Sequence, residues 1–271
     1  MTIIKALGTG SAFTMEGYQT NYVITRGDKN LLIDCGGDVR FSLKDQGLGA
    51  KDIDGVYLSH AHADHVGGIE WLAFTRYFTK LGMERAGHPN PLELPKLFCE
   101  RGMILSLWDH TLKGGLEGLE GIDATIDTYF DVVAVEKNGS FEWEGLKFDI
   151  VQSLHVSAKY SILDSFGFMF TDDDGTRVFF TTDVQFAPET AMKAYYQEAD
   201  LIIHDCETGY PSGVHAHYDQ LCTLRPEIKS KIWLVHYQDN VIENFGGWNN
   251  RAKEAGFRGF AEPGVIYSSV V

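Results

Sequence analysis

The chain is poor in cysteine and has no long apolar run. Its four cysteines, Cys35, Cys99, Cys206 and Cys222, are far apart and form no C-x-x-C pair. This spacing excludes a structural zinc ribbon and argues against a disulfide framework. No stretch approaches the roughly 18 apolar residues of a membrane span, and the first residues lack the apolar core of a signal peptide. We therefore expect a protein of the reducing cytoplasm with no membrane partner.

Basic residues are also scarce. Lys and Arg number 23 against 38 Asp and Glu, so the formal net charge is −15. A field of this sign repels the phosphate backbone of long nucleic acid, which we therefore do not expect as a partner. The charge does not exclude a small anion that is held at a local cation.

In other respects the composition is that of a globular protein. Hydrophobic residues make up 44% of the 271 positions and charged residues 23%, enough for a sizeable core. We expect one domain over residues 1–271, because the sequence has no repeat, low-complexity tract or linker. Segments near 80–95 and 112–128 are expected to be insertions that act as a lid or a dimer contact.

Strand-like and helix-like patterns alternate irregularly along the chain. This order predicts an α/β protein of layered α+β type, with helices that cover packed sheets, and not a simple doubly wound sheet. Periodicity and turn residues predict helices at Ile69–Phe78, near Gly102–Leu112 and at Pro188–Gln197. They predict strands at Val56–Ser59, Leu146–Leu154 and Phe166–Phe170, a loop at Gly82–Pro95, and a hairpin turn at Asp172–Gly175.

The most informative stretch is Ser59-His60-Ala61-His62-Ala63-Asp64-His65. It follows a short apolar strand and precedes two glycines and a predicted helix, so it lies at a strand-to-helix turn. Its four potential ligands fall within six residues and can converge on one point. Imidazole nitrogen and carboxylate oxygen suit Zn²⁺, Mn²⁺ or Fe²⁺. We interpret the stretch as a metal site, with a solvated polar loop as the weaker alternative.

Three further positions place a ligand type at the end of an apolar strand. They are His155, Asp183 and His236. Strand ends are rigid platforms, and several ends on one rim of a sheet can converge. A single strand-end histidine is more often structural, but these three together with the histidine-rich turn predict a shared site. The seven candidates exceed what one catalytic metal with an open position needs, so we expect two metals.

A family resemblance follows from this order of residues. Asp34, His60-x-His62-x-Asp64-His65, His155, Asp183 and His236 resemble the five-motif signature of the metallo-β-lactamase fold, in the form of its phosphodiesterase and ribonuclease Z-like branches. The resemblance implies an αββα sandwich with a dimetal site at one edge. It implies that His60, His62 and His155 hold one metal, that Asp64, His65 and His236 hold the other, and that Asp183 bridges both.

The same resemblance implies roles for residues around the metals. Asp34 would orient a ligand and steady its turn, with a plain turn aspartate as the alternative. His217 matches a family histidine that contacts the scissile phosphate, so Asp64 and His217 are the expected catalytic residues. His215 is either a further substrate candidate or a surface histidine. His204, Asp205 and Glu207 would support the site or only cap the strand before them.

Longer segments, among them Gly8–Phe13, Asp127–Asp131 and Pro211–His217, resemble a smaller group, the phage anti-Pycsar proteins and their bacterial homologues. This resemblance implies hydrolysis of 3′,5′-cyclic nucleotide monophosphates (cyclic CMP, UMP, AMP and GMP) to linear nucleoside monophosphates. Such an activity counteracts an anti-phage defence that signals with cyclic nucleotides. The resemblance also implies two Zn²⁺ ions, with Mn²⁺ as a substitute, a homodimer, and the host cytoplasm if the chain is phage-encoded.

Other activities stay open at this point. A ribonuclease Z-like tRNA 3′-processing endonuclease would typically have an arm rich in glycine and basic residues, whereas Gly114–Gly121 contains Glu117 and Glu120. A lactonase or β-lactamase would leave the region around His217 without a purpose. A protein of another class, which sequesters nucleotides without hydrolysis, would have little need for the full ligand set. A flavodiiron-type redox site is disfavoured, because it usually has glutamate at the second motif histidine.

Overall fold

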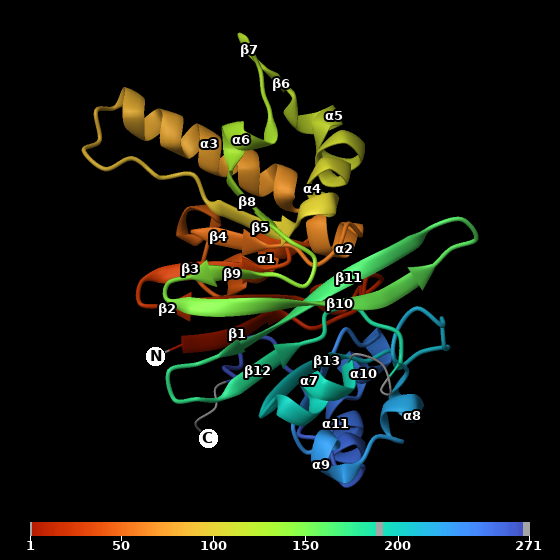
Figure 1. Ribbon diagram of the computed structural model, residues 1–271. Helices are drawn as coiled ribbons and strands as arrows, with labels where there is room; N and C mark the ends of the chain where they lie inside the picture. Colours follow the sequence, from red (N-terminus) through yellow and green to blue (C-terminus); the bar gives the residue numbers. More distant parts are fainter. Residues whose placement is uncertain (1, 188–191, 268–271) are drawn as a thin grey trace.

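The computed structural model describes residues 2–187 and 192–267, in which two β-sheets lie face to face (Figure 1). The strands of the first sheet are β1 (Thr2–Gly8), β2 (Asn21–Arg26), β3 (Lys29–Ile33), β4 (Gly55–Tyr57), β5 (Lys96–Glu100) and β8 (Asp131–Val135). Those of the second are β9 (Ser140–Trp143), β10 (Leu146–Ser157), β11 (Ile162–Thr171), β12 (Arg177–Phe180), β13 (Leu201–Asp205), β14 (Ile232–Val235) and β15 (Gly259–Phe260). Two short strands, β6 (Gly118–Leu119) and β7 (Ile122–Asp123), form a separate ribbon.

Each sheet is part antiparallel and part parallel. The first has the order β1-β2-β3-β4-β5-β8, antiparallel from β1 to β3 and parallel from β3 to β8. The second has the order β15-β14-β13-β12-β11-β10-β9, antiparallel from β9 to β12 and parallel from β12 to β15. The parallel strands β3, β4, β12, β13 and β14 all run toward one edge of the sandwich, where the candidate site lies.

Helices cover the outer faces of both sheets. Those in the first half of the chain are α1 (Val39–Asp45), η1 (Ala50–Asp52), α2 (Ala63–Val66), α3 (Ile69–Arg85), α4 (Arg101–Leu107), η2 (Trp108–Leu112), α5 (Lys113–Leu116) and α6 (Ile126–Tyr129). Those in the second half are α7 (Met192–Glu198), α8 (Tyr218–Leu221), α9 (Pro226–Lys229), α10 (Asp239–Glu243) and α11 (Phe245–Glu254). Figure 1 shows α3 above the first sheet and α7, α9 and α11 below the second. No helix among the described residues is both long enough and apolar enough to cross a membrane.

The core follows from the two-residue period of the strands. In β2, Tyr22 and Ile24 pack between the sheets, whereas Val23 packs against the outer helices. In β13, Leu201 and Ile203 face the inter-sheet core and Ile202 faces the helices of the second layer. Successive strand residues point to opposite faces of a sheet, and here one face packs on the other sheet while the other face is covered by helices. Each inner strand therefore buries both of its sides. The result is the expected αββα sandwich.

Several expected elements have different limits in the structure. The helix predicted at Ile69–Phe78 continues to Arg85 and ends before Gly87, which has a φ of +68°. The loop prediction is therefore wrong for its first residues: Gly82 lies within the helix. The stretch near Gly102–Leu112 is divided into α4 and the π-helical η2. The predicted start of a helix at residues 188–191 lies outside the described residues, and α7 follows it.

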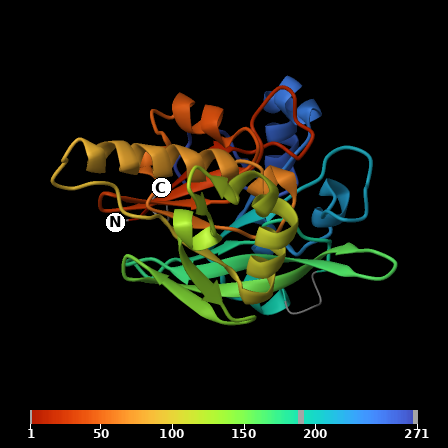
Figure 2. The same cartoon turned by 90° about the horizontal axis from the view of Figure 1, so that it is seen from above.

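The β10–β11 hairpin is longer than the predicted strands. The pairing continues to Ser157 opposite Ile162, and Figures 1 and 2 show the hairpin projecting beyond the body of the protein. The sequence did not indicate this arm, because residues exposed on both sides of a two-stranded ribbon need no apolar alternation. The predicted hairpin turn at Asp172–Gly175 is confirmed, since it joins antiparallel β11 and β12.

The two segments predicted to be insertions lie on the helical layer of the first sheet. Residues 80–95 form the end of α3 and the loop that leads to β5, and residues 112–128 include α5, the β6–β7 ribbon and part of α6. Their roles as a lid or a dimer contact stay predictions.

Candidate metal centre

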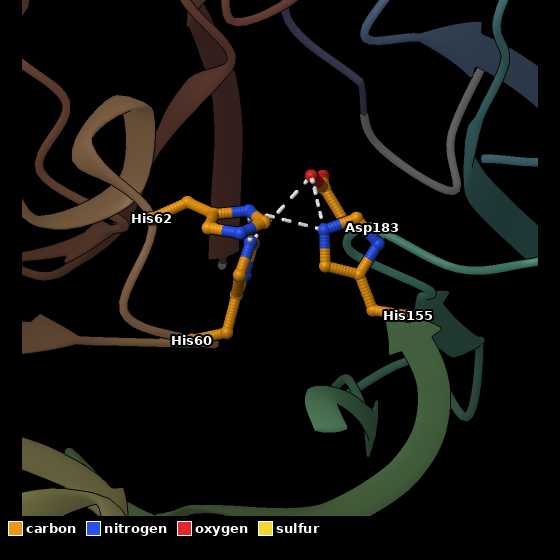
Figure 3. Close-up of side chains that lie close together, drawn as sticks. All are labelled: His60, His62, His155 and Asp183. Carbon is orange, nitrogen blue, oxygen red and sulfur yellow. Dashed lines mark hydrogen bonds and ion pairs between the residues drawn. The ribbon is translucent and has the colours of Figure 1, made fainter. Parts of the chain in front are cut away.

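The first group of ligand types gathers beside the turn that follows β4. Its members are His60, His62, His155 and Asp183, whose candidate ligand atoms all lie within 4.8 Å of one another (Figure 3). Nδ1 of His62 lies 3.0 Å from Nε2 of His60 and 3.1 Å from Nε2 of His155. Oδ2 of Asp183 lies 3.6 Å from Nε2 of both His60 and His155. Three imidazoles and a carboxylate therefore surround one point.

A second group shares the Asp183 carboxylate with the first. It consists of Asp64, His65, Asp183 and His236, all of them buried. Oδ2 of Asp64 lies 3.1 Å from Nε2 of His65 and 3.2 Å from Nε2 of His236. Oδ2 of Asp183 lies 3.3 Å and 3.6 Å from the same two nitrogens. All seven residues that the sequence predicted as ligands are thus brought together, with Asp183 between the two groups.

The local backbone explains how the histidine-rich turn presents its side chains. His62 is extended (φ −71°, ψ 151°) and is the N-cap of the short helix α2. His60 and His62 are two residues apart, and in extended backbone such residues point to the same side. Asp64 and His65 then lie within one helical turn. The small side chains of Ala61 and Ala63 separate the ligand types without crowding them.

Three residues at the site adopt left-handed backbone conformations. Asp34 has a φ of 59°, Thr182 a φ of 51° and His236 a φ of 63°. Asp and His tolerate this region better than most residues, whereas for β-branched Thr182 it is a true outlier. Thr182 immediately precedes Asp183, so strained backbone lies where the shared carboxylate is presented, as is common at functional sites.

Asp34 lies behind the ligand types of the second group. Its Oδ2 is 2.7 Å from Nδ1 of His65 and accepts a hydrogen bond from the Ser59 hydroxyl at 2.9 Å. Its Oδ1 accepts from the Ser59 backbone N–H at 2.8 Å. The carboxylate therefore fixes both the start of the histidine-rich turn and the ring of His65, whose Nε2 is left to face the cluster.

The sequence suggested that His155 follows the end of a strand. In the structure, His155 lies within β10. The β10–β11 register shifts between Leu154 and Val156, so His155 occupies an irregular position that turns it toward the cluster. Nδ1 of His155 donates to the carbonyl oxygen of Val214 at 2.9 Å. This hydrogen bond leaves Nε2 facing the other ligand types, the arrangement typical of metal-binding histidines.

The electrostatics of the cluster favour a bound cation. Burial opposes charge on Asp183, but His236 and His65 hold its pKa well below the usual range. Burial and the nearby histidines lower the pKa of His60 well below its ordinary value. For His65, burial is outweighed by the surrounding carboxylates, first Asp183 and then Asp34, which raise its pKa. The buried Asp183 carboxylate thus remains charged and attracts positive charge, which a proton or a metal ion can supply.

His215 and His217 differ sharply in position. Nδ1 of His215 lies 2.8 Å from Oδ2 of Asp205, and its ring lies 4.7 Å from that of His236 and 5.0 Å from that of His155. His217 is the N-cap of α8: its Nδ1 accepts from the Asp219 N–H, and its Nε2 donates to the Gly209 carbonyl. His215 therefore lies at the cluster. Both ring nitrogens of His217 are instead occupied by hydrogen bonds to backbone groups near it in the chain.

His204 and Glu207 have supporting positions. His204 is fully buried on the helical side of β13, where its Nε2 lies 2.7 Å from the Tyr196 hydroxyl. Oε2 of Glu207 accepts from the Ser212 N–H at 2.7 Å, and so braces the loop that carries His215. Neither residue belongs to the groups of ligand atoms.

Asp205, for which the sequence left open a supporting role or a strand cap, lies at the site. Its Oδ2 accepts from the Val184 N–H at 2.9 Å as well as from His215, and Asp183, Asp205, His215 and His236 form a third group of ligand types. The sequence contained a signal for this. Neighbouring strand residues face opposite sides, so once His204 is assigned to the helical side, Asp205 must face the site.

Comparisons with known proteins agree on family and fold. A family model described as "Anti-Pycsar protein Apyc1" matches residues 2–267. The chain is 36% identical over 248 residues to the anti-Pycsar protein Apyc1 of Paenibacillus xerothermodurans, with 90% of each chain covered. It is 32% identical over 249 residues to the protein of the same name from Bacillus phage BSP38, with 90% of this chain and 92% of the relative covered.

Solved structures share the architecture at lower identity. The metallo-β-lactamase fold protein YhfI of Bacillus subtilis has a TM-score of 0.71 and 20% identity over 98% of each chain. A diphosphatase of the PhnP family has a TM-score of 0.73 and 17% identity over 99% of this chain and 98% of its own. The short form of human tRNase Z has a TM-score of 0.69 and 17% identity over 100% of each chain. These likenesses establish the metallo-β-lactamase fold.

Proposed function

The chain belongs to the anti-Pycsar protein Apyc1 family, and on that premise we propose that it is a dimetal phosphodiesterase. Its substrates are 3′,5′-cyclic nucleotide monophosphates, including cyclic CMP, UMP, AMP and GMP, and its products are linear nucleoside monophosphates. The observation that supports this most directly is the pair of ligand groups that share one oxygen of Asp183. Such a pair suits hydrolysis of phosphodiesters better than a single-metal site does.

The residues present fit divalent metals. The donors are imidazole nitrogens and carboxylate oxygens, the set preferred by Zn²⁺ and also compatible with Mn²⁺. Nε2 of His65 is buried and has no hydrogen-bond partner among residues 2–187 and 192–267, as expected for a metal ligand. His60, His62 and His155 would hold one ion, Asp64, His65 and His236 the other, and Asp183 both. When bound, the two ions supply an activated water and stabilise charge on the phosphoryl oxygens.

The protein's own groups orient these ligands and supply a proton. Asp34 and the Val214 carbonyl hold the rings of His65 and His155 with one nitrogen toward the cluster. His215 takes the role that the family resemblance gives to His217, because it lies beside the cluster. Asp205 holds Nδ1 of His215, which leaves Nε2 to contact the phosphate or to donate a proton to the leaving ribose oxygen.

The family name also informs the biological setting. Cleavage of cyclic nucleotides would remove the messenger of an anti-phage defence, and relatives with the anti-Pycsar name occur in both phages and bacteria. We also propose that the protein forms a homodimer and acts in the cytoplasm. Light scattering of the purified protein at several concentrations tests the dimer.

Product analysis tests the proposal. The purified protein, loaded with Zn²⁺ or Mn²⁺, is incubated with each of the four cyclic nucleotides, and linear monophosphates are separated by chromatography. His62→Ala should reduce turnover by at least about 100-fold, because it removes a ligand. His110→Ala is the matched control, since His110 is exposed on η2 and outside the ligand groups.

The possible outcomes separate the proposed activity from its alternatives. Intact cyclic nucleotides after incubation with metal-loaded protein contradict the proposed activity. Cleavage of precursor tRNA instead would favour the ribonuclease Z-like alternative, since this chain shares its fold with human tRNase Z. Binding of a cyclic nucleotide with full recovery of the ligand would indicate sequestration.

A further inference from the structure

A small cavity lies beneath the metal cluster, between the two sheets. Its volume is about 20 Å³, and its lining includes Tyr22 from β2, Asp205 from β13 and His236 from the end of β14. A cavity needs roughly 10–15 Å³ by this kind of measure to hold one water molecule, and such a water needs two to four polar partners. The volume therefore accommodates one water molecule and leaves no room for another molecule beside it.

Besides Nε2 of His65, which faces the metal cluster, three polar atoms of the residues that line this cavity lack partners. Oη of Tyr22, Oδ1 of Asp205 and Nδ1 of His236 are buried, and none has a hydrogen-bond partner in the described part of the chain. Nδ1 of His236 lies 3.5 Å from Oδ1 of Asp205, too long for a good direct hydrogen bond. Buried polar groups in native proteins are nearly always paired, so three orphans around one cavity indicate a shared partner.

The chemistry of the three atoms matches a water molecule. The Tyr22 hydroxyl and the N–H of the His236 tautomer with its hydrogen on Nδ1 are donors, and Oδ1 of the Asp205 carboxylate is an acceptor. A water molecule accepts two hydrogen bonds and donates two, so it can serve all three groups at once. Nε2 of His236 points toward Asp64 and the cluster, which leaves the Nδ1 side of the ring to be held from the cavity.

We infer that a single ordered water in this cavity links Tyr22, Asp205 and His236, and that Tyr22 is a positioning residue for the metal ligand His236. The inference rests on the proposed function in one respect, since it takes His236 as a ligand. Through the water, the Tyr22 hydroxyl limits the rotation of the His236 ring. Asp205 then supports two histidines at once, His215 directly and His236 through the water.

Replacement of Tyr22 by Phe separates this inference from a purely structural role. If the Tyr22 hydroxyl were only an unpaired group in the core, Tyr22→Phe would be neutral or stabilising, because it removes a buried polar atom. If the hydroxyl holds the water, Tyr22→Phe should weaken metal binding about tenfold, the lower end of the range for groups behind metal ligands. The ring itself, which packs edge-on against Phe180 at 5.2 Å, is retained in either case.

Tyr57→Phe is the matched control. Tyr57 lies on β4 in the same inter-sheet core, is fully buried, and donates its hydroxyl hydrogen to the Phe166 carbonyl at 2.7 Å. It does not line the cavity. Loss of that hydrogen bond should lower stability without a change in metal affinity, so the control separates damage to the core from damage to the metal site.

The experiment is a Zn²⁺ titration of the chelator-treated full chain against a competing dye, together with a high-resolution crystal structure. A tenfold weaker site in Tyr22→Phe, unchanged affinity in Tyr57→Phe and density for one water in the cavity support the inference. Unchanged affinity in Tyr22→Phe, or a dry cavity, overturns it. Failure of the wild type to bind zinc would instead contradict the proposed function, while the crystal density still decides the question of the water.

Discussion

Nδ1 of His65 lies 2.7 Å from Oδ2 of Asp34, although Asp34 follows strand β3 and His65 lies in helix α2. The same carboxylate accepts two hydrogen bonds from Ser59. One buried group therefore joins the end of β3 to the start of the histidine-rich turn, and sets which nitrogen of His65 faces the cluster. Asp34 thus orients a residue of the cluster without belonging to the groups of ligand atoms itself.

We predict that Asp34→Asn lowers metal affinity and activity by about 10–100-fold. Asparagine tolerates the left-handed backbone at this position, so the change removes charge and one acceptor without new strain. Metal content after dialysis and the rate of cyclic nucleotide cleavage measure the effect. Asp28→Asn, at an exposed position, is the control and should behave as wild type. Full metal content and rate in Asp34→Asn would show that its hydrogen bonds are only structural.

His215 and His217 provide a second test. His215→Ala should reduce kcat by about 100-fold or more, because it removes a proton donor beside the cluster. His217→Asn should retain activity, since asparagine is a good N-cap and can replace the hydrogen bond to the Asp219 N–H. Steady-state kinetics of both variants decide the assignment. The opposite ranking would restore the role that the family resemblance gives to His217.

His204 should make stability sensitive to acid. Burial holds its pKa below the ordinary value, and both ring nitrogens are occupied in the neutral form, by the Asp205 carbonyl and the Tyr196 hydroxyl. The unfolded chain then binds more protons than the folded one as the pH falls through about 6.5, so the free energy of unfolding decreases there.

The comparison of wild type with His204→Gln isolates this effect. The substitution should cost about 1–3 kcal/mol at neutral pH, because it disrupts buried hydrogen bonds. The difference between the two proteins should shrink as the pH falls from about 7.5 to about 5.5, since only the wild type loses stability through His204. Urea unfolding of metal-free protein at each pH measures it. A difference that does not change with pH would mean that His204 titrates normally when folded.

Metal removal should destabilise the fold. Asp64 and Asp183 are buried near each other, and a cation offsets their repulsion. At a free metal concentration of 100 times Kd, binding of one ion stabilises the native state by about 2.7 kcal/mol. Thermal unfolding with Zn²⁺ and after chelation should therefore differ, and His62→Ala should show a smaller difference. Equal unfolding temperatures with and without metal in the wild type would argue against a metal centre.

The sequence by itself determined the layered fold, the histidine-rich turn and the seven residues that meet at the cluster. These are local or strongly patterned features. Apolar strands can be recognised by their two-residue period, and ligand types at strand ends can be recognised from the sequence alone. It did not determine which of His215 and His217 faces the site, because a loop can present either residue. Only the tertiary structure decided this, through the cap that His217 provides to α8.

The tertiary structure also decided the place of Asp205, the irregular position of His155 and the cavity behind His236. Each depends on the register between strands that are distant in the sequence, and a shift of one residue would turn every side chain to the other face. The length of the β10–β11 arm was likewise hidden, since a two-stranded ribbon in solvent leaves no apolar pattern. The sequence thus determines which residues are candidate ligands, whereas the packing of the two sheets determines how their side chains are oriented.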